Sequence, residues 1–167
     1  EFEDKRIKHD EWATMKAGSP AGALPILTID GTTTVTQSGA ILRYIGKRGG
    51  LYPEAEQDQL LVEEVIGLIG DINQALAPSS YIMMRPEAFG HDDRSEDDRK
   101  AIQAKLRKKL VEDEFPTNRQ LKYLDELLGR TPSPFVTSSD KPSIADLLVL
   151  SIVRRFASGM LDGIPTD

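Results

Sequence analysis

The chain of 167 residues contains no cysteine and only two histidines, His9 and His91. Without cysteine it cannot form a disulfide, a zinc–thiolate site or an iron–sulfur cluster, and it has no thiol nucleophile of its own. Two histidines are too few for a multi-histidine metal centre. The composition therefore predicts a protein without a metal cofactor.

Long apolar runs and an excess of basic residues are also missing. No hydrophobic stretch approaches the roughly 20 residues that a membrane-spanning helix needs, and the first residues do not resemble a signal peptide. Lys and Arg number 21 against 27 Asp and Glu, which gives a formal net charge of −6. Proteins that follow nucleic-acid phosphates need basic patches. We expect a soluble, cytoplasmic protein that binds neither nucleic acid nor membranes.

Residues 1–50 predict a small α/β domain. Residues 2–9 suit a strand, although they carry many charges. Leu24–Ile29 and Thr32–Thr36 are rich in apolar and β-branched residues, which favour strands. Between them, Asp30-Gly31 is a strong hairpin signal, because both turn positions require positive φ. These two later segments therefore predict a β-hairpin.

A short helix is predicted directly after the hairpin. Ser38 precedes its apolar residues, and serine is a favoured N-cap because its hydroxyl accepts a hydrogen bond from a free backbone N–H. The glycines at positions 46, 49 and 50 can end this helix. Residues 51–56 then predict a linker.

Residues 57–167 predict an all-helical domain. The hydrophobic period changes here from 2 to 3.6, and no later segment resembles a strand. One long amphipathic helix is predicted over residues 57–84, with Pro78 kinking or breaking it late in its course. Further helices are predicted between residues 95 and 129, with a division at Pro116.

The last predicted helix, Leu147–Phe156, is apolar on nearly every face. Such a helix is expected to lie buried at the centre of its domain. Ser143 stands before it, and Asp146 follows three residues later. This spacing is typical of a capping box, in which each side chain accepts a hydrogen bond from the other residue's backbone N–H. We interpret Ser143 and Asp146 as structural residues.

The residues around the predicted hairpin carry the chemistry of a binding site. Gln37 and Ser38 stand at a helix N-terminus, where free N–H groups and partial positive charge suit a carboxylate. Gln37 adds an amide and Ser38 a hydroxyl at the same point. A cis bond between Leu24 and Pro25 would turn the backbone outward, so that it could pair with an extended peptide. The arrangement predicts capture of a small anionic peptide.

These motifs resemble those of the cytosolic glutathione transferases. The resemblance rests on Leu24–Leu27, Asp30-Gly31 and the run Thr36–Ile45, and on Ser143–Leu147, which is similar to the capping box of the family's central helix. The motifs occur in the family's order, and the resemblance covers essentially the whole chain. It is similar to the branch that includes the sigma, mu, pi and alpha classes.

The resemblance implies a fold of two parts. Residues 1–50 would form a thioredoxin-like, glutathione-binding domain without its first strand and helix, and residues 57–167 an all-helical domain, joined by the linker 51–56. The family's last helices would follow Asp167. We interpret the chain as a piece of a longer protein.

The resemblance also implies how glutathione would be held. Pro25 would be the family's cis-proline, and the backbone of Leu24 would pair with the cysteinyl part of the peptide. Gln37 and Ser38 would hold the γ-glutamyl carboxylate.

Three further residues match positions that contact glutathione in the family. Trp12 and Lys16 have the spacing that in related members reaches the glycyl carboxylate. Asp71 matches a position that contacts the γ-glutamyl ammonium from across the dimer. The resemblance thus implies a homodimer in which the partner subunit completes the site.

The implied activity is that of a detoxifying transferase that joins the glutathione thiolate to hydrophobic electrophiles. The family stabilises this thiolate with a Tyr or Ser hydroxyl on its first strand and helix, which is expected upstream of Glu1, so no catalytic residue is assigned within the chain. Two alternatives stay open. One is a non-catalytic binding or structural module of the same fold, and the other is a glutathione-dependent isomerase or peroxidase.

Overall fold

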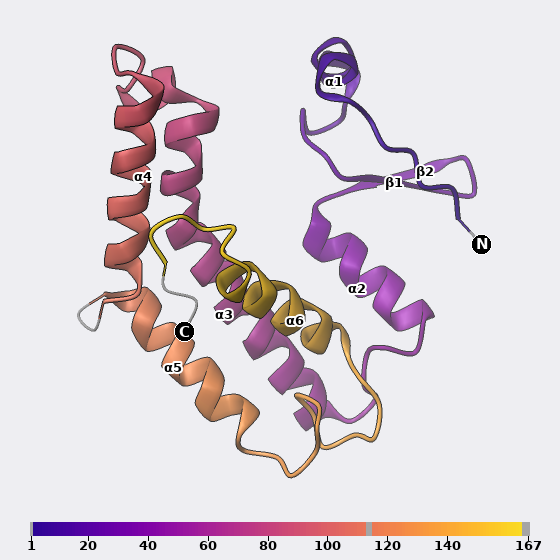
Figure 1. Cartoon of the computed structure of the whole chain (residues 1–167). Coiled ribbons are helices and arrows are strands. Elements are labelled where there is room, and N and C mark those ends of the chain that lie inside the picture. Colours follow the sequence, from indigo (N-terminus) through magenta and orange to yellow (C-terminus); the bar gives the residue numbers. More distant parts are fainter. Residues whose placement is uncertain (1, 113–114, 165–167) are drawn as a thin grey trace. The chain divides into compact units, whose positions relative to one another are not determined.

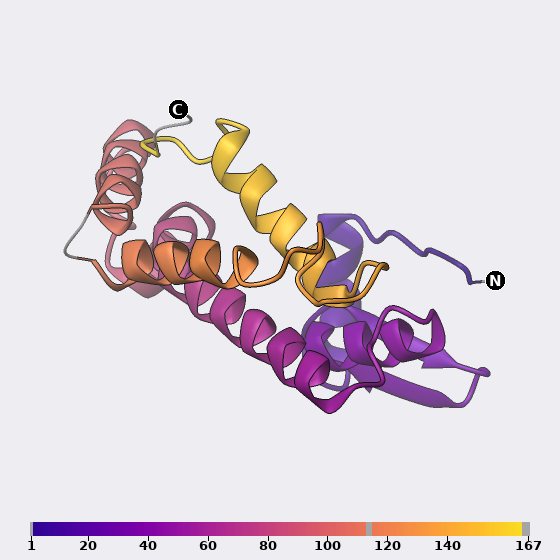
Figure 2. The same cartoon turned by 90° about the horizontal axis from the view of Figure 1, so that it is seen from below.

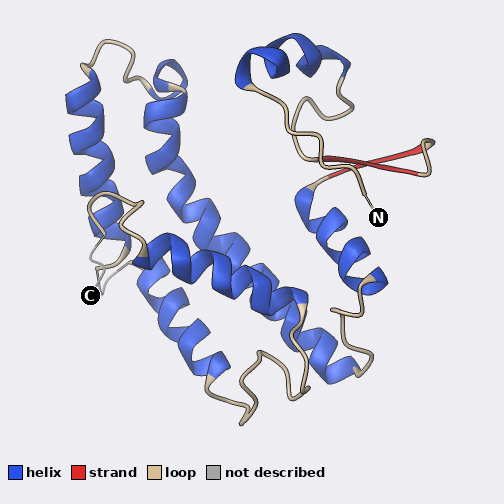
Figure 3. Cartoon of the chain, turned by 45° about the vertical axis from the view of Figure 1, so that its right-hand side comes forward, coloured by secondary structure: helices blue, strands red, loops and turns tan. Residues whose placement is uncertain are grey.

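The computed structural model describes residues 2–112 and 115–164 of the chain (Figure 1). The chain divides into two compact units, Glu1–Gly50 and Leu51–Asp167. The first unit is mixed α/β, whereas the second is built from helices and loops in its described part. The difference between the two is plain when the chain is coloured by secondary structure (Figure 3).

The first unit contains a small antiparallel sheet between helical segments. Its elements are α1 (His9–Met15), the 3₁₀ turn η1 (Lys16–Gly18), β1 (Ile26–Ile29), β2 (Thr33–Thr36) and α2 (Ser38–Arg48). The two strands pair antiparallel, with Ile26 opposite Thr36 and Ile29 opposite Thr33.

The predicted β-hairpin is confirmed, with a small difference in its turn. Asp30 and Gly31 adopt φ values of 50° and 69°, as expected for this pair. Because Ile29 lies opposite Thr33, the connection has three residues rather than two, and the second strand begins one residue later than predicted. The N–H of Thr32 closes the turn by donating to the carbonyl of Ile29 at 3.1 Å.

The strand predicted over residues 2–9 is wrong. Residues 2–8 have no regular structure, and α1 begins at His9. A strand needs a neighbour to pair its backbone groups. In the described part of the chain the sheet has two strands, which pair with each other. Local sequence pattern could suggest an extended segment, but it could not supply the neighbour.

The second unit is organised around one long helix. Its elements are α3 (Glu56–Met84), the 3₁₀ turn η2 (Pro86–Phe89), α4 (Glu96–Leu110), α5 (Pro116–Leu128) and α6 (Ile144–Ala157). Helix α3 contacts α4, α5 and α6, and α4 lies alongside its C-terminal half (Figures 1 and 2). Pro78 lies within α3, which continues unbroken to Met84.

One face of α3 forms the centre of the hydrophobic core. Its buried apolar residues alternate at spacings of three and four, which places them on a single helix face: Val62, Val65, Ile69, Ile72 and Leu76. Leucines and isoleucines of the other helices cover this face, among them Leu124, Leu127, Ile144 and Ile152. The core of the described structure therefore lies in the second unit.

The expectation that the last helix would be buried at the centre is wrong. In α6, Ile144, Ala145 and Ile152 are buried, but Leu147, Leu150 and Val153 are 44%, 54% and 51% exposed. The reason is that α3, not α6, contacts all the other long helices of the unit. An apolar composition does not reveal which face of a helix meets a neighbour.

The predicted capping box at the start of α6 is confirmed. The backbone N–H of Ser143 donates to Oδ2 of Asp146 at 2.7 Å, and Oγ of Ser143 accepts from the N–H of Ala145 at 3.2 Å. The other oxygen of Asp146 accepts from the N–H of Val136 at 2.8 Å. Asp146 therefore also fastens the connector that precedes the helix.

Candidate functional site

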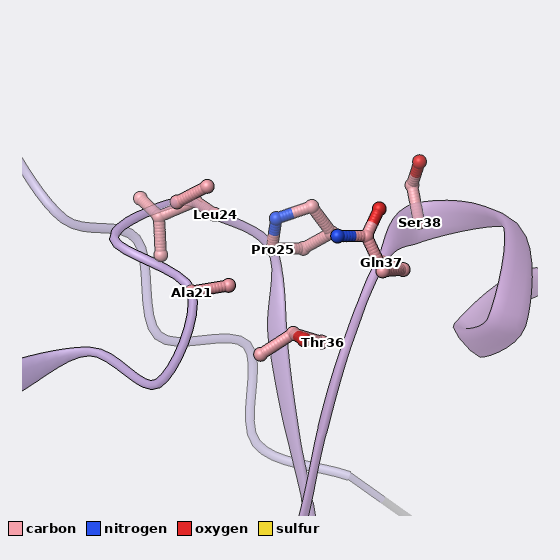
Figure 4. A pocket seen from close by; sticks show the side chains of 7 residues that line it. Ala21, Leu24, Pro25, Thr36, Gln37 and Ser38 are labelled. Carbon is pink, nitrogen blue, oxygen red and sulfur yellow. The ribbon is translucent and has the colours of Figure 1, made fainter.

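A small pocket lies in the first unit where the loop before β1 faces the start of α2 (Figure 4). It is lined by Ala21, Ala23, Leu24, Pro25, Thr36, Gln37 and Ser38. Its volume is about 80 Å³. Pockets for whole small-molecule ligands usually measure roughly 300–1,000 Å³. This pocket can therefore hold one end of a peptide-sized ligand.

One wall of the pocket comes from the irregular segment before β1. The peptide bond between Leu24 and Pro25 is cis, as the resemblance implies. Leu24 lies outside the β1–β2 ladder, which begins at Ile26, and its side chain is exposed. Backbone groups at a sheet edge are available to an extended peptide. The wall itself is apolar, since its side chains are those of alanine, leucine and proline.

The opposite wall is polar and is formed where β2 gives way to α2. Thr36 is the last residue of β2, and Ser38 is the first of α2. In Figure 4 the amide of Gln37 extends toward Pro25, while the hydroxyl of Ser38 points away from the ribbon. No charged side chain lines the pocket. A bound carboxylate would thus be held by neutral donors.

Gln37, rather than Ser38, occupies the N-cap position of α2. Its backbone has φ 76° and ψ 111°, and its carbonyl accepts from the N–H groups of Ala40 and Ile41, both at 3.1 Å. This sharp turn starts the helix one residue earlier than a Ser38 cap would, so the predicted capping role of Ser38 is wrong. The hydroxyl of Ser38 is consequently free of a capping bond and can serve a ligand.

The backbone turn at Gln37 has two consequences for the site. It leaves the first N–H groups of α2, those of Ser38 and Gly39, at the pocket end of the helix, where the helix dipole favours an anion. A non-glycine residue at positive φ costs about 1–3 kcal/mol, and such conformations cluster at binding sites. The strain at Gln37 therefore marks the same place as the pocket.

The other residues that the resemblance singles out lie elsewhere. Trp12, on α1, is partly exposed and Lys16, in η1, is exposed, and neither lines the pocket. Asp71 is an exposed residue of α3, in the second unit. The structure brings together Leu24, Pro25, Gln37 and Ser38, and the ligand contacts of the other three stay predictions.

The structure adds three residues that the sequence did not single out as site residues: Ala21, Ala23 and Thr36. Alanine carries no chemical signal of binding, so the first two could not have been found from the sequence. Thr36 had a signal, because it directly precedes Gln37 at the end of a predicted strand. Its hydroxyl adds a third polar side chain to the same wall.

In residues 2–112 and 115–164, no three His, Cys, Asp or Glu side chains gather closely enough to hold a metal ion. None of the helices in these ranges is long and apolar enough to cross a membrane.

Several of the relatives that sequence comparison finds are named glutathione S-transferase. Glutathione S-transferase 1 of Ascaris suum is 27% identical over 168 residues, covering 96% of this chain and 73% of that protein. Glutathione S-transferase 3 of Caenorhabditis elegans is 26% identical, and the match covers 100% of this chain and 73% of the nematode protein. Glutathione S-transferase 2 of Manduca sexta is 33% identical over 81 residues, which span 48% of this chain and 39% of the moth protein. No protein-family model matches the chain.

Structure comparison agrees with these relatives. The glutathione S-transferase of Ascaris lumbricoides superposes with a TM-score of 0.70 at 24% identity, covering 95% of this chain and 69% of that one. The monomeric Na-GST-3 of the hookworm Necator americanus superposes with a TM-score of 0.69 at 24% identity. The match covers 99% of this chain and 75% of the hookworm chain. Likeness at this identity establishes the fold.

The chain has the fold of the glutathione transferases, with a thioredoxin-like first unit and a helical second unit. In sequence it is similar to proteins named glutathione S-transferase.

Proposed function

We propose that the chain belongs to a glutathione transferase, which joins the sulfur of glutathione to hydrophobic electrophiles. The observation that carries the proposal is the pocket in which cis Leu24–Pro25 faces the Gln37-Ser38 start of α2. The relatives' shared name supports the same function.

In this proposal the pocket holds the γ-glutamyl end of glutathione. Its carboxylate accepts hydrogen bonds from the Gln37 amide, the Ser38 hydroxyl and the free N–H groups at the start of α2. The backbone of Leu24 pairs with the cysteinyl residue in the manner of an added strand. The volume of about 80 Å³ suits this one end of the tripeptide.

The chemistry proceeds at the thiol of the bound peptide. A free thiol has a pKa of about 8.5, and a lower pKa raises the thiolate fraction at neutral pH. The thiol proton leaves to solvent, and the sulfur attacks the electrophilic carbon. A carbon–sulfur bond forms, and the leaving group departs with its electron pair. We assign no residue of this chain to the hydroxyl that the family uses to stabilise the thiolate.

The remaining predicted contacts belong to the same proposal. Trp12 and Lys16 would reach the glycyl carboxylate, and Asp71 would reach the γ-glutamyl ammonium of a partner subunit in a homodimer. Two features of α3 support a helix–helix interface there. Asp71 is exposed, and nothing lies within 4 Å of where side chains at Gly67 and Gly70 would begin. We further propose a cytoplasmic detoxification enzyme close to the sigma, mu, pi and alpha classes.

Calorimetry with the whole chain tests the proposal. Glutathione is expected to bind at one site per chain. Ser38→Ala should weaken the binding by about 1–3 kcal/mol, the cost of losing a hydrogen bond to a charged group. Ser151→Ala is the matched control, because that hydroxyl lies on α6 and donates to the carbonyl of Leu147. Its affinity should equal that of the wild type.

Two outcomes would count against the proposal. Absence of heat at millimolar glutathione would contradict glutathione binding altogether. Binding without conjugation of an activated aryl chloride by the full-length protein would favour the alternative of a non-catalytic module.

A further inference from the structure

The segment that follows α6 makes an unusually close contact with α4. Residues Ser158–Ile164, here called the strap, leave the end of α6 and run across to α4 (Figure 1). Although the strap has no regular secondary structure, Leu161 and Ile164 are only 4% and 8% exposed. These two side chains anchor the strap in the apolar interior of the unit.

Gly163 allows the closest approach. It adopts φ 88°, and a Cβ at this position would collide with the backbone of Ala104 in α4. The strap and α4 therefore touch backbone to backbone, which only glycine permits. Gly159, also in the strap, has a comparable φ of 72° but open space around it. The two glycines differ in packing and not in the sign of φ.

One turn beyond Ala104, α4 carries a buried cation. Arg107 is 7% exposed, and its Nε donates to Oγ of Ser79 on α3 at 3.2 Å. Gln103 on the same face of α4 donates to the carbonyl of Ser79 at 2.7 Å. The positive charge of Arg107 thus meets neutral groups of α3, an unfavourable situation for a buried ion.

The strap brings a negative charge to this cation. Burial lowers the pKa of Arg107, while the charge of Asp162, next to Gly163, opposes that change and Arg155 adds to it. Asp162 also acts on Lys100, one turn before Ala104. The contact that seats Gly163 on α4 therefore also brings the charge of Asp162 near this part of α4.

We propose that the strap is a conformational latch that couples α6 to α4 and holds the negative charge of Asp162 near the buried Arg107. The two helices both pack on α3, and the strap adds a direct connection between them. With the strap seated, the end of α6 and the middle of α4 open together. With the strap released, they open separately, and the charge of Asp162 moves away from Arg107.

Hydrogen–deuterium exchange of the full chain tests the latch. Gly163→Ala should raise exchange about tenfold in the strap, in the last turn of α6 and around Ala104 in α4, since the added Cβ collides with the backbone of Ala104 and displaces the strap. Gly159→Ala introduces the same side chain at positive φ without a collision, and should leave exchange in α4 unchanged. A rise confined to the residues beside Gly163, or equal effects of the two variants, would overturn the proposal.

A second variant covers the case in which Gly163→Ala does not fold. Asp162→Asn keeps the shape of the side chain and removes its charge. It should raise exchange at the same three places at low ionic strength, and the difference from wild type should shrink in 1 M salt, with a screening length of roughly 3 Å. Exchange identical to wild type at low ionic strength would overturn the proposed role of the Asp162 charge.

Discussion

At the scale of single residues, Gln37 combines two properties that the site needs. Its side-chain amide lines the pocket, and its backbone, at φ 76°, turns the chain into α2 so that the helix begins at the pocket. The amide could be predicted from the sequence because Gln37 lies next to a predicted helix start. The positive φ of its backbone could not be predicted, since this conformation is uncommon for any residue other than glycine, asparagine and aspartate.

Replacing Gln37 separates the two properties. Gln37→Ala should weaken glutathione binding by about 1–3 kcal/mol, because a hydrogen bond to a charged carboxylate is lost. Titration calorimetry measures this change. Unchanged affinity would contradict the assignment of the amide to the ligand.

The backbone is tested by comparing Gln37→Ala with Gln37→Gly. Both variants lack the amide, but only glycine adopts positive φ without a steric cost. We expect the glycine variant to unfold at a higher denaturant concentration than the alanine variant. Its free energy of unfolding should be greater by about 1 kcal/mol. Equal stability, or a more stable alanine variant, would contradict the turn at Gln37.

At the scale of helices and strands, features set by neighbouring residues followed from the sequence. The turn at Asp30-Gly31 and the Ser143–Asp146 capping box depend on residues within three positions, and both are present. The strand predicted over residues 2–9 and the burial of α6 depend on distant partners, and both expectations failed. Part of the pocket could be predicted from the sequence for the same reason. Gln37 and Ser38 form a local motif, whereas Ala21 comes close to them only when the chain folds.

The capping box supplies a prediction about stability. Asp146→Ala should lower the free energy of unfolding by about 0.5–2 kcal/mol, as measured losses of helix caps do. The loss in free energy of unfolding is expected near the upper end of this range, because Asp146 also accepts a hydrogen bond from the N–H of Val136. Thermal or denaturant unfolding measures it. Asp125→Ala, on the exposed side of α5, is the control and should change stability by less than about 0.5 kcal/mol.

Glutathione affinity distinguishes a structural role from a binding role. The Asp146→Ala protein should bind glutathione as the wild type does. A folded variant that loses affinity while keeping its stability would show that the structural interpretation of the capping box is wrong.

The first turn of α4 predicts a dependence on pH. Glu96 and Lys100 form an ion pair of 2.7 Å, and Lys100 holds the pKa of Glu96 below its usual value of 4.5. A carboxylate whose pKa is lowered by folding stabilises the folded state above its unfolded pKa and loses that effect as the pH falls through its folded value. Glu96→Gln should therefore be less stable than wild type at neutral pH.

The difference in stability between wild type and Glu96→Gln should disappear in acid. Below pH 4.5 the two proteins should converge as Glu96 becomes protonated in the wild type. Denaturant unfolding at a series of pH values measures the convergence, and Lys100→Gln should show the same behaviour. A difference that persists unchanged in acid would contradict the ion pair as its cause.

At the scale of the whole molecule, the buried apolar side chains of the described residues are concentrated in the second unit, around α3. The candidate binding pocket lies in the first unit, where Gly46 is the one described residue that is fully buried. The helical unit therefore provides most of the hydrophobic core, and the α/β unit provides the candidate binding pocket.

The proposed homodimer makes a prediction about mass in solution. If α3 forms the interface, Gly67→Arg should fill the open space at this position with a charged side chain and convert dimers to monomers. Sedimentation velocity measures the change, and Ser151→Arg, equally exposed on α6, should leave the dimer intact. A wild-type protein that is already monomeric, as the hookworm Na-GST-3 is described, would contradict the proposal.

The central claim is that glutathione binds at the start of α2. The most direct test is a titration of the isotope-labelled chain with glutathione, followed through its backbone amide signals by nuclear magnetic resonance. We predict that the largest shifts belong to the N–H groups of Leu24, Ser38 and Gly39. Shifts that instead concentrate in the helical unit, or that are absent at millimolar glutathione, would contradict the claim.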